Sequence, residues 1–419
     1  MNITIHPRRL GGEIRAIASK SQAHRLLICA AFADKPTKIV CAELSQDIEA
    51  SVRCLTALGA DISYIGACFH VHPIEMPAGD ALLDCGESGA TLRFLLPIVA
   101  ALGVSADFVL RGRLSQRPLS PLWELLEAHG CRLSRPSADT LHCEGRLRSG
   151  SYAIAGNISS QFISGLLFAL PLCGAESNIM LTTECASASY IGMTLSALRS
   201  FAIAVDARAD GWHLPAMQRY QSPGRVRVEG DWSNAAFWLC AGAVSSEIVC
   251  TNLDSHSPQG DRAIFDILER FGATLSRNGD CLRVSRAALQ GIELDASDIP
   301  DLVPPIALLA TQASGATILR GVERLRIKES DRLESICGAL RSLGAKVEIA
   351  PDTLIIHEST LRGGSIDSCN DHRIAMLAAI ASSVCTESIH LRGADAVRKS
   401  YPRFWEDFRT LGGQKEEDA

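Results

Sequence analysis

The segment RIKESDRL, residues 326–333, carries five charges in eight residues, whereas only 21% of the whole chain is charged. It lies between an apolar run typical of a strand, GATILRGV, and one typical of a helix, LESICGAL. The ordinary explanation of so many charges is a helix start that faces solvent. The alternative is a site for an anionic ligand that also needs a carboxylate for proton transfer, with Glu329 as that carboxylate.

A second candidate acid or base is Asp301, in the segment SDIPDLVPPIALLA. It precedes an apolar, helix-like run, where burial is expected to raise its pKa. A role as helix N-cap explains the same spacing equally well. Glu329 and Asp301 are therefore the candidates for acid–base chemistry.

Several helix-like runs open with a hydroxyl-rich turn and carry a basic residue within their first turns. Capping alone explains each opening, because serine and aspartate are ordinary N-caps. A cation beside free N–H groups and the positive end of a helix dipole additionally favours phosphate or carboxylate. The expected openings are Lys20–Ser21, Ser88–Gly89, Ser159–Gln161, Ser187, Ser330 and Asn370–Asp371, and the basic residues are Lys20, Arg25, Arg93, Arg332 and Arg373. Arg117 and Lys399 lie in two further basic segments, although a solvated loop explains either one alone.

The elements that must position these residues form a sixfold repeat. A helix end, a small residue and a strand recur as LTALGADI, LLEAHGCRL, LRSFAIAV, LERFGATL, LRSLGAKV and FRTLGGQK, with gaps of 71, 72, 70, 72 and 68 residues. Each copy predicts a helix that ends at a left-handed residue. These residues are Gly59, Gly130, Ala202, Gly272, Gly344 and Gly412. Six copies at near-constant spacing indicate six α/β units.

The six units are expected to form two lobes of three units each. A stretch with Pro and Gly, residues 218–231, is the candidate crossover between units three and four. The N-terminal strand NITIHP belongs to no unit and is expected to complete the second lobe. The last unit is expected to lack a strand, because only the polar GQKEEDA follows Gly412. The predicted lobes are residues 19–228, and residues 1–18 with 229–419.

Composition argues against several classes of protein. The chain has 419 residues, 47% of them hydrophobic, which is enough for two domains with real cores. The net charge of −6 argues against general nucleic-acid binding, and no apolar segment is long enough for a membrane span or a signal peptide. The 15 cysteines contain no CxxC pair and are interpreted as reduced core residues. A cytoplasmic protein is therefore expected.

Nine segments along the chain carry a resemblance to a known family. They are SKSQAHR, ESGATLR, QRP, SSQF, SASY, IPD, KESDRL, NDHRIAM and RKSYPRF, and they cover nearly the whole chain in this order. Their order and separation resemble the 5-enolpyruvylshikimate-3-phosphate synthases, the enolpyruvyl transferases of the shikimate pathway. The resemblance implies a two-lobed α/β (α+β) fold, an inside-out α/β barrel with three repeated units in each lobe.

The resemblance also implies a role for each site residue. The shikimate 3-phosphate ligands would be Lys20, Ser21, Arg25, Ser159, Ser160, Gln161, Ser187, Tyr190, Asp301 and Lys328. The phosphoenolpyruvate ligands would be Lys20, Gly89, Arg117, Gln161, Arg332, Arg373 and Lys399. The first lobe would be mainly the shikimate 3-phosphate side, and the second mainly the phosphoenolpyruvate and catalytic side.

The implied reaction is an addition followed by an elimination. The 5-hydroxyl of shikimate 3-phosphate attacks C2 of phosphoenolpyruvate while C3 takes a proton, and the tetrahedral intermediate then loses phosphate and a C3 proton. Glu329 is expected to carry the C3 proton and Asp301 to take the hydroxyl proton, with Lys20 assisting either. Ser330 is expected to cap the helix that follows RIKESDRL. No metal or organic cofactor is implied, and the expected partners of a monomer are the two substrates, without nucleic acid or membrane.

Three residues depart from the family's common pattern. Glu87 stands where asparagine is frequent, Phe94 where proline is frequent, and Arg324 where some members have asparagine. These departures leave the substrate affinities open. Gly89 leaves room for glyphosate, a competitor for the phosphoenolpyruvate site, so sensitivity to it is expected.

Two alternative functions are weaker. The sister enolpyruvyl transferase acts on UDP-N-acetylglucosamine and typically has a reactive cysteine in the loop where RLSQRPLS stands, but the nearest cysteines here are Cys85 and Cys131. A non-catalytic, anion-binding relative would be expected to have lost Lys20, Asp301 or Glu329, and all three are present.

Overall fold

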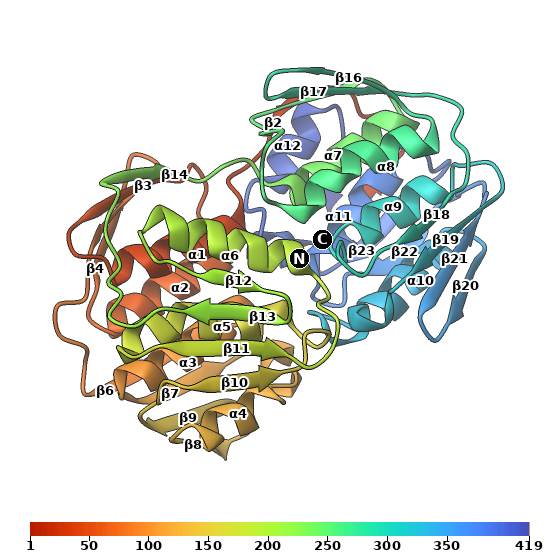
Figure 1. The fold of residues 1–419 in the computed structure, drawn as a ribbon. Helices are drawn as coiled ribbons and strands as arrows, with labels where there is room; N and C mark the ends of the chain where they lie inside the picture. Colours follow the sequence, from red (N-terminus) through yellow and green to blue (C-terminus); the bar gives the residue numbers. More distant parts are fainter. Residues whose placement is uncertain (419) are drawn as a thin grey trace. The chain divides into compact units, whose positions relative to one another are not determined.

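The computed structural model describes residues 1–418, and the chain divides into two compact units (Figure 1). We call Ala18–Val228 the first lobe, and Met1–Ile17 with Glu229–Ala419 the second lobe. The chain therefore leaves the second lobe after Ile17 and returns to it at Glu229.

The first lobe is built from three consecutive α/β repeats. Its helices are α1 (Lys20–Ala31), α2 (Gln46–Ala57), α3 (Gly89–Leu102), η1 (Gly112–Gln116), α4 (Leu122–Ala128), α5 (Ser160–Ala169), η2 (Leu170–Cys173) and α6 (Ala188–Ser200). Its strands are β3 (Thr37–Val40), β4 (Asp61–Ile65), β5 (Cys68–His72), β6 (Asp80–Gly86), β7 (Ser105–Leu110), β8 (Cys131–Ser137), β9 (Thr140–Gly145), β10 (Ser151–Ile154), β11 (Ser177–Leu181), β12 (Asp206–Arg208), β13 (Gly211–Leu214) and β14 (Arg225–Arg227).

The second lobe repeats the same plan with different lengths. Its helices are α7 (Trp232–Val244), η3 (Gly260–Ala263), α8 (Ile264–Phe271), α9 (Val303–Ala310), η4 (Glu323–Ile327), α10 (Arg332–Ser342), α11 (His372–Ala381), η5 (Ala394–Lys399) and α12 (Phe404–Thr410). Its strands are β1 (Asn2–His6), β2 (Gly12–Arg15), β15 (Ile248–Thr251), β16 (Thr274–Asn278), β17 (Cys281–Ser285), β18 (Glu293–Asp295), β19 (Ala316–Arg320), β20 (Val347–Ala350), β21 (Thr353–His357), β22 (Gly364–Asp367), β23 (Ile389–Arg392) and β24 (Gln414–Glu417).

The strands form six four-stranded sheets with one shared topology. In each sheet one edge strand runs parallel to its neighbour and the other two pairings are antiparallel, as in β6-β7-β9-β8 and β18-β19-β21-β20. All six residues predicted to end a helix have a positive φ, from 60° at Ala202 to 113° at Gly59. The six predicted repeats are therefore confirmed.

Strands that are distant in sequence complete three of the sheets. Strand β14 pairs parallel with β3, and β2 pairs parallel with β15. Strand β1 pairs antiparallel with both β23 and β24, with Ile3 opposite Glu417. The expectation that the last repeat lacks a strand is wrong, because GQKEEDA contains β24. An edge strand needs backbone partners more than an apolar face, so its polar side chains do not prevent pairing.

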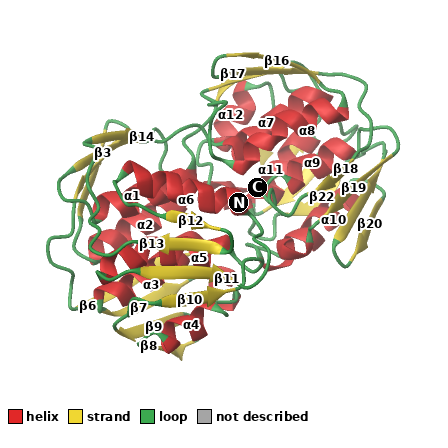
Figure 2. Ribbon diagram, in the orientation of Figure 1, coloured by secondary structure: helices red, strands yellow, loops and turns green. Residues whose placement is uncertain are grey.

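The core of each lobe consists of helices, with the sheets outside them (Figure 2). Every residue of α7, α9 and α11 is buried, which is typical of a core helix. The strands alternate between buried and more exposed residues, as β7 does, which is typical of a sheet with one solvated face. This arrangement confirms the predicted inside-out α/β fold.

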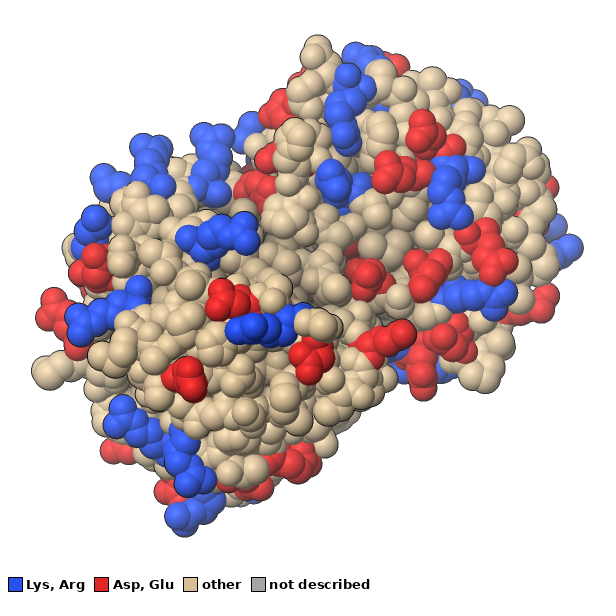
Figure 3. Space-filling view, in the orientation of Figure 1, with Lys and Arg blue, Asp and Glu red and all other residues tan. Residues whose placement is uncertain are grey.

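All 15 cysteines are free thiols, and Cys369 is the one that is exposed among the described residues. Burial raises the pKa of others, such as Cys337, to about 12, so they remain protonated thiols. No helix within residues 1–418 is long and apolar enough to cross a membrane. On the face drawn in Figure 3, basic and acidic side chains are interspersed.

Candidate active site

Helix α1 begins at Lys20, whose ammonium group pairs with a carboxylate on a neighbouring helix. The N-cap is Ser19, whose hydroxyl accepts from the backbone N–H of Gln22 at 3.4 Å. Lys20 Nζ donates to Asp47 Oδ2, on α2, at 2.9 Å. Both side chains are mostly buried, with 17% and 14% of their surface exposed. Lys20 is therefore held in one place while its ammonium group keeps some access to solvent.

Arg25 is a buried cation whose hydrogen-bond partners are neutral. Its guanidinium donates to the hydroxyl of Thr194 at 2.9 Å and to the carbonyls of Ser21 and Tyr190 at 2.6 and 2.9 Å. Its carbon lies 5.1 Å from the ring centroid of Phe94. Burial lowers the pKa of Arg25 to about 10, because desolvation disfavours the charged form. A buried cation of this kind is stabilised by a bound anion.

The N-terminus of α3 brings two guanidinium groups together over one glycine. A Cβ added to Gly89 would lie 2.6 Å from Nη1 of Arg117 and 2.8 Å from Nη1 of Arg93. Arg93 also donates to Gln161 Oε1 at 3.0 Å and to the carbonyl of Pro118 at 3.1 Å. Gly89 is required by space here, since the two cations and the first-turn amides converge on it. Such a convergence favours a small anion.

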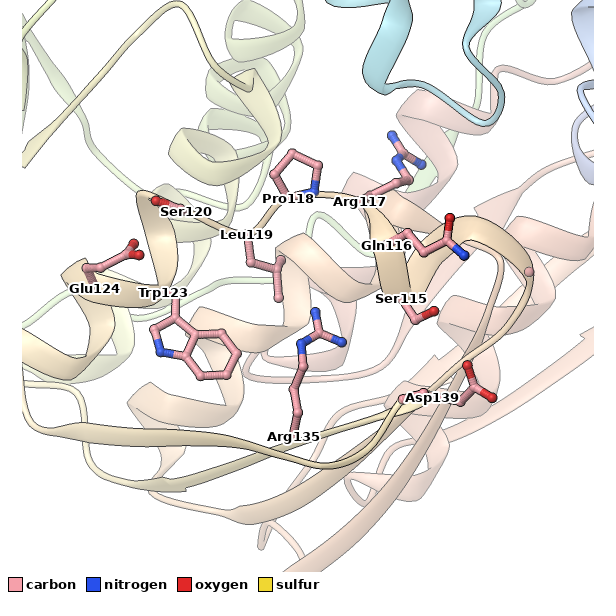
Figure 4. A pocket seen from close by; sticks show the side chains of 12 residues that line it. Ser115, Gln116, Arg117, Pro118, Leu119, Ser120, Trp123, Glu124, Arg135 and Asp139 are labelled. Atoms are coloured by element: carbon pink, nitrogen blue, oxygen red, sulfur yellow. The ribbon is translucent and has the colours of Figure 1, made fainter.

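The loop that carries Arg117 also borders a groove on its other side (Figure 4). Leu119, Trp123 and Arg135 point into this groove, whereas the side chain of Arg117 points away from it. Because the guanidinium of Arg117 reaches Gly89, the candidate anion site lies on the side of the loop away from the groove.

Helices α5 and α6 begin at the predicted serines. Ser159 is the N-cap of α5, and its hydroxyl accepts from the backbone N–H of Gln161 at 3.3 Å. Ser160 follows it and is buried. Ser187 is the N-cap of α6 and has a left-handed backbone with φ 58° and ψ 42°. That conformation costs about 1–2 kcal/mol for a residue with a Cβ, and such strain is frequent at functional sites.

In the second lobe, a buried ion cluster surrounds Arg332 at the start of α10. Four hydrogen bonds join its guanidinium to three carboxylates: one to Asp301 Oδ1 at 2.8 Å, two to Asp371 at 2.8 and 3.3 Å, and one to Glu329. The Arg332 side chain is only 1% exposed. Burial opposes its charge, but Asp371, Glu329 and Asp301 together raise its pKa above the ordinary value. Arg332 therefore stays charged and orients the three carboxylates.

Asp301 bridges two arginines. Its Oδ1 accepts from Arg332, and its Oδ2 accepts from Arg373 Nη2 at 2.8 Å. The expectation that burial raises its pKa is wrong. Burial acts in that direction, but Arg373, Lys328 and Arg332 hold the pKa of Asp301 well below its usual range. Asp301 is not the N-cap of α9 either, since that position is Leu302.

The rest of RIKESDRL differs in one respect from expectation. Ser330 does not cap α10: the N-cap is Asp331, which accepts from the backbone N–H of Glu334 at 3.2 Å. Ser330 instead donates to Asp371 Oδ2 at 3.1 Å. Aspartate and serine are equally good caps, and here the next residue along the chain takes the position.

Lys328 lies beside the ion cluster and is half-buried. Burial lowers the pKa of Lys328 to about 8, although Asp301 and Glu329 act in the opposite direction. Arg324, one of the departures from the family pattern, adds to the lowering. Lys328 is thus a cation that can lose its proton close to neutral pH.

Arg373 and Lys399 are held near the start of α11. Asp371 is the N-cap of α11 and accepts from the backbone N–H of Arg373 at 3.0 Å. The guanidinium of Arg373 also receives support from Ser233, whose hydroxyl accepts from Nη2 at 3.0 Å. Lys399 Nζ donates to the carbonyl of Asn370 at 2.6 Å. The structure thus brings together all the predicted residues of this lobe.

Sequence reasoning missed three residues that hold predicted site residues in place. Asp371 was expected only as part of a helix start, and Asp47 and Ser233 were not expected at all. Asp47 lies 27 residues from Lys20, and Ser233 lies 140 residues from Arg373. No local pattern links residues at such separations, so only their tertiary contacts reveal them.

Glu87 and Phe94 are the other two departures from the family's common pattern, and both lie close to predicted site residues. The carboxylate of Glu87 lies against the loop of Arg117, because a Cβ on Gly112 would lie 2.6 Å from Glu87 Oε2. Phe94 is buried in α3, where its ring supports the guanidinium of Arg25 and packs edge-on against Phe168 at 5.6 Å. Phe94 therefore stabilises the Arg25 cation from the position where proline is frequent in the family.

Comparison with known proteins identifies the family. The model of the family described as EPSP synthase (3-phosphoshikimate 1-carboxyvinyltransferase) matches residues 5–408. The 3-phosphoshikimate 1-carboxyvinyltransferase of Clostridium kluyveri is 40% identical over 419 residues, which cover 99% of this chain and 98% of the relative. The enzyme of the same name from Clostridium perfringens strain SM101 is 41% identical over 416 residues, with 98% of each chain covered. The chain belongs to the EPSP synthase family.

Solved structures agree on the fold. An EPSP synthase from Acinetobacter baumannii superposes with a TM-score of 0.82 at 23% identity, over 99% of this chain and 100% of that one. The enolpyruvyl transferase NikO from Streptomyces tendae superposes with a TM-score of 0.79 at 18% identity, over 99% and 98%. The chain therefore has the two-lobed enolpyruvyl transferase fold.

Proposed function

We propose that the predicted anion ligands of the first lobe and the residues around Arg332 in the second lobe carry out the family's reaction in this chain. The protein transfers the enolpyruvyl group of phosphoenolpyruvate to shikimate 3-phosphate, a step of aromatic amino acid biosynthesis. The observation that carries the assignment of residues is the cluster of Asp301, Glu329 and Arg332, because it places two candidate proton carriers on one buried guanidinium.

The first lobe supplies mainly anion ligands. The shikimate 3-phosphate ligands from this lobe are Lys20, Ser21, Arg25, Ser159, Ser160, Gln161, Ser187 and Tyr190. The phosphoenolpyruvate ligands from this lobe are Lys20, Gly89, Gln161 and Arg117. The neutral surroundings of Arg25 and the two guanidinium groups over Gly89 support these roles, since both arrangements gain stability from a bound phosphate or carboxylate.

The second lobe supplies ligands and proton carriers together. Asp301 and Lys328 contact the substituents of the shikimate ring, and Arg332, Arg373 and Lys399 bind phosphoenolpyruvate. Arg332 already donates four of its hydrogen bonds to carboxylates. A substrate anion therefore takes its remaining N–H or replaces one carboxylate.

The reaction moves two protons. The 5-hydroxyl oxygen bonds to C2 of phosphoenolpyruvate while the electrons of the C2–C3 double bond take a proton from Glu329. The C2–O bond to phosphate then breaks, and a C3 proton returns to Glu329 as the double bond re-forms. The hydroxyl proton ends on the departing phosphate, with Asp301 and Lys20 as its carriers.

Substrate binding prepares Asp301 for this step. In the free protein Arg373, Lys328 and Arg332 lower its pKa, which makes it a weak base. An anionic substrate bound to the same cations offsets their field and raises the pKa of Asp301 towards its usual value. The carboxylate then becomes a better acceptor for the hydroxyl proton.

Phosphate release from phosphoenolpyruvate tests the proposal. We expect release with shikimate 3-phosphate as acceptor and none with UDP-N-acetylglucosamine. Glu329→Gln is expected to lower kcat by two to four orders of magnitude, roughly the range of general acid–base catalysis. Glu334→Gln is the matched control, because Glu334 lies in the first turn of α10 with a side chain that is 54% exposed. Release with the nucleotide sugar, or equal losses in the two variants, would overturn the assignment.

We propose a monomer of 44.9 kDa that works in the cytoplasm, where its 15 free thiols stay reduced. Sedimentation at the mass of a dimer would contradict the first point. We also propose that glyphosate inhibits the enzyme, because Gly89 has no side chain to displace the two guanidinium groups that converge on it. Unchanged activity in millimolar glyphosate would contradict that expectation.

A further inference from the structure

A buried chain of hydrogen bonds runs through the first lobe from His24 to Ser88. His24 Nδ1 lies 2.7 Å from Ser51 Oγ, and Ser51 Oγ lies 2.8 Å from Thr91 Oγ1. The hydroxyl of Thr91 donates to Ser88 Oγ at 2.8 Å. All four side chains are at most 1% exposed. A fully buried polar chain of this kind is rigid, because no water competes for its members.

The direction of these hydrogen bonds assigns the tautomer of His24. Since the Thr91 hydroxyl donates to Ser88, it accepts from Ser51, and Ser51 in turn accepts from His24. His24 therefore carries its proton on Nδ1. Its Nε2 is buried without a hydrogen-bond partner in the part of the chain that the structure describes.

The charge state of His24 agrees with this assignment. Burial lowers the pKa of His24 well below its ordinary value, and the nearby cations Lys20 and Arg25 lower it further. The ring is therefore neutral, with one N–H donor, and that donor is the one that starts the chain.

Each end of this chain of hydrogen bonds lies next to a proposed substrate ligand. His24 follows Lys20 by one turn of α1, and Ser51 follows Asp47, the partner of Lys20, by one turn of α2. Residues four apart lie on the same face of a helix. At the other end, Ser88 caps α3 directly before Gly89. The hydrogen bonds thus join α1 and α2, which carry Lys20 and its partner Asp47, to the start of α3, where two guanidinium groups converge.

We propose that His24 is a positioning residue for the enolpyruvyl transfer: its Nδ1–H, through Ser51 and Thr91, fixes Lys20 relative to Gly89. This inference rests on the proposed roles of Lys20 and Gly89. His24 itself touches neither substrate. Two reactants must be aligned closely, and a misplacement of about 1 Å can lower the rate on the order of 100-fold.

Two amide variants separate this role from simple packing. The side-chain nitrogen of asparagine can occupy the place of Nδ1, whereas that of glutamine matches Nε2. His24→Asn is therefore expected to keep kcat within a few-fold of wild type, and His24→Gln and His24→Leu to lower it on the order of 10- to 100-fold. The KM values change less than kcat, because both substrates still find their ligands.

A second pair of variants tests the far end of the chain. Thr91→Val removes the hydroxyl at nearly constant volume and is expected to lower kcat as His24→Leu does, whereas Thr91→Ser restores it. The double variant His24→Leu with Thr91→Val is expected to lose no more than the worse single variant, because both break one chain. Thr317→Val is the matched control: Thr317 is a buried threonine of the second lobe whose hydroxyl has no partner among the described residues.

The measurements are kcat and both KM values per folded active site, with the folded fraction from circular dichroism. Equal kcat in the asparagine, glutamine and leucine variants at equal folded fraction would overturn the inference, as would additive losses in the double variant. If a variant fails to fold, the comparison of Thr91→Val with Thr91→Ser decides in the same way. Lys20→Met tells the two proposals apart. Full activity of Lys20→Met overturns the site itself. If Lys20→Met is inactive but the His24 variants keep the kcat of the wild type, only the positioning role is overturned.

Discussion

The two lobes hold their buried arginines in opposite ways. In the first lobe, Arg25 donates to a hydroxyl and two carbonyls and pairs with no carboxylate of residues 1–418. In the second lobe, Arg332 is equally buried but donates to three carboxylates. The pKa of Arg25 is consequently lowered to about 10, whereas that of Arg332 is raised.

We propose that this difference separates anion binding from proton transfer. A buried cation among neutral dipoles gains stability from a bound anion, as expected of a ligand for phosphate or carboxylate. A cation that already orients several carboxylates adds little net charge, but it places groups that can move protons. Lys20 is the exception in the first lobe, because Asp47 pairs with it. That pairing fits its proposed part in proton transfer.

The largest expected effect comes from removing a carboxylate of the second lobe. Asp371→Ala leaves Arg332 and Ser330 without their buried partner, and Asp371 itself is 0% exposed. We expect a loss of about 3–5 kcal/mol in the free energy of unfolding, measured with urea. The control is Glu293→Ala, which breaks a pair with Arg320 whose side chains are more than half exposed. It should cost less than about 1 kcal/mol, and similar losses in both variants would contradict the comparison.

A smaller effect on stability, but a clear one on binding, is expected in the first lobe. Arg25→Met removes a cation without leaving a buried carboxylate unpaired. We expect the dissociation constant for shikimate 3-phosphate, measured by calorimetry, to rise about 10- to 100-fold, as for loss of a charge-assisted hydrogen bond. The free energy of unfolding should change less than in Asp371→Ala. A variant that unfolds like Asp371→Ala would show that Arg25 is mainly structural.

The space over Gly89 predicts an effect on one substrate. Gly89→Ala places a Cβ within 3 Å of the guanidinium groups of Arg117 and Arg93, so both must shift. We expect the KM for phosphoenolpyruvate to rise about tenfold, with little change in stability, because the ends of flexible side chains can move. Gly192→Ala is the control, since an added Cβ there meets nothing within 4 Å. An unchanged KM in Gly89→Ala would remove this glycine from the site.

The smallest expected effect is a pH dependence in the second lobe. The pKa of Lys328 is lowered to about 8, so the free enzyme loses this cation as the pH rises above 8. We expect kcat/KM for shikimate 3-phosphate to fall up to tenfold per pH unit above that value. In Lys328→Arg the decline should disappear, because arginine stays protonated. A decline that persists unchanged in that variant would assign it to another group.

The same pKa predicts a change in stability with the opposite sign. Between about pH 8 and the ordinary lysine pKa, the unfolded chain binds a proton at this position that the folded chain does not. Stability therefore rises with pH in this window relative to a Lys328→Met variant. Urea unfolding of both proteins at pH 7.5 and 9.5, two values chosen about the shift, measures this difference.

The sequence predicts the fold better than it predicts the partners and pKa values of the site residues. The six helix ends were recognisable because each needs a left-handed residue, and even Ala202 adopts that conformation. Strand β24 was missed because its side chains are polar, while its partners are backbone groups of β1. The pKa of Asp301 was predicted in the wrong direction, because the arginines that lower it are 31 and 72 residues away. Residue types could be read locally, but their partners could not.

The most direct test compares substrate binding and turnover between a variant of each lobe. Calorimetry should show that Glu329→Gln binds shikimate 3-phosphate within a few-fold of wild type, while phosphate release falls by two to four orders of magnitude, roughly the range of a lost proton carrier. Arg25→Met should show mainly lost binding. If Glu329→Gln instead loses binding as strongly as turnover, Glu329 is a ligand and the proposed division between anion binding and proton transfer is wrong.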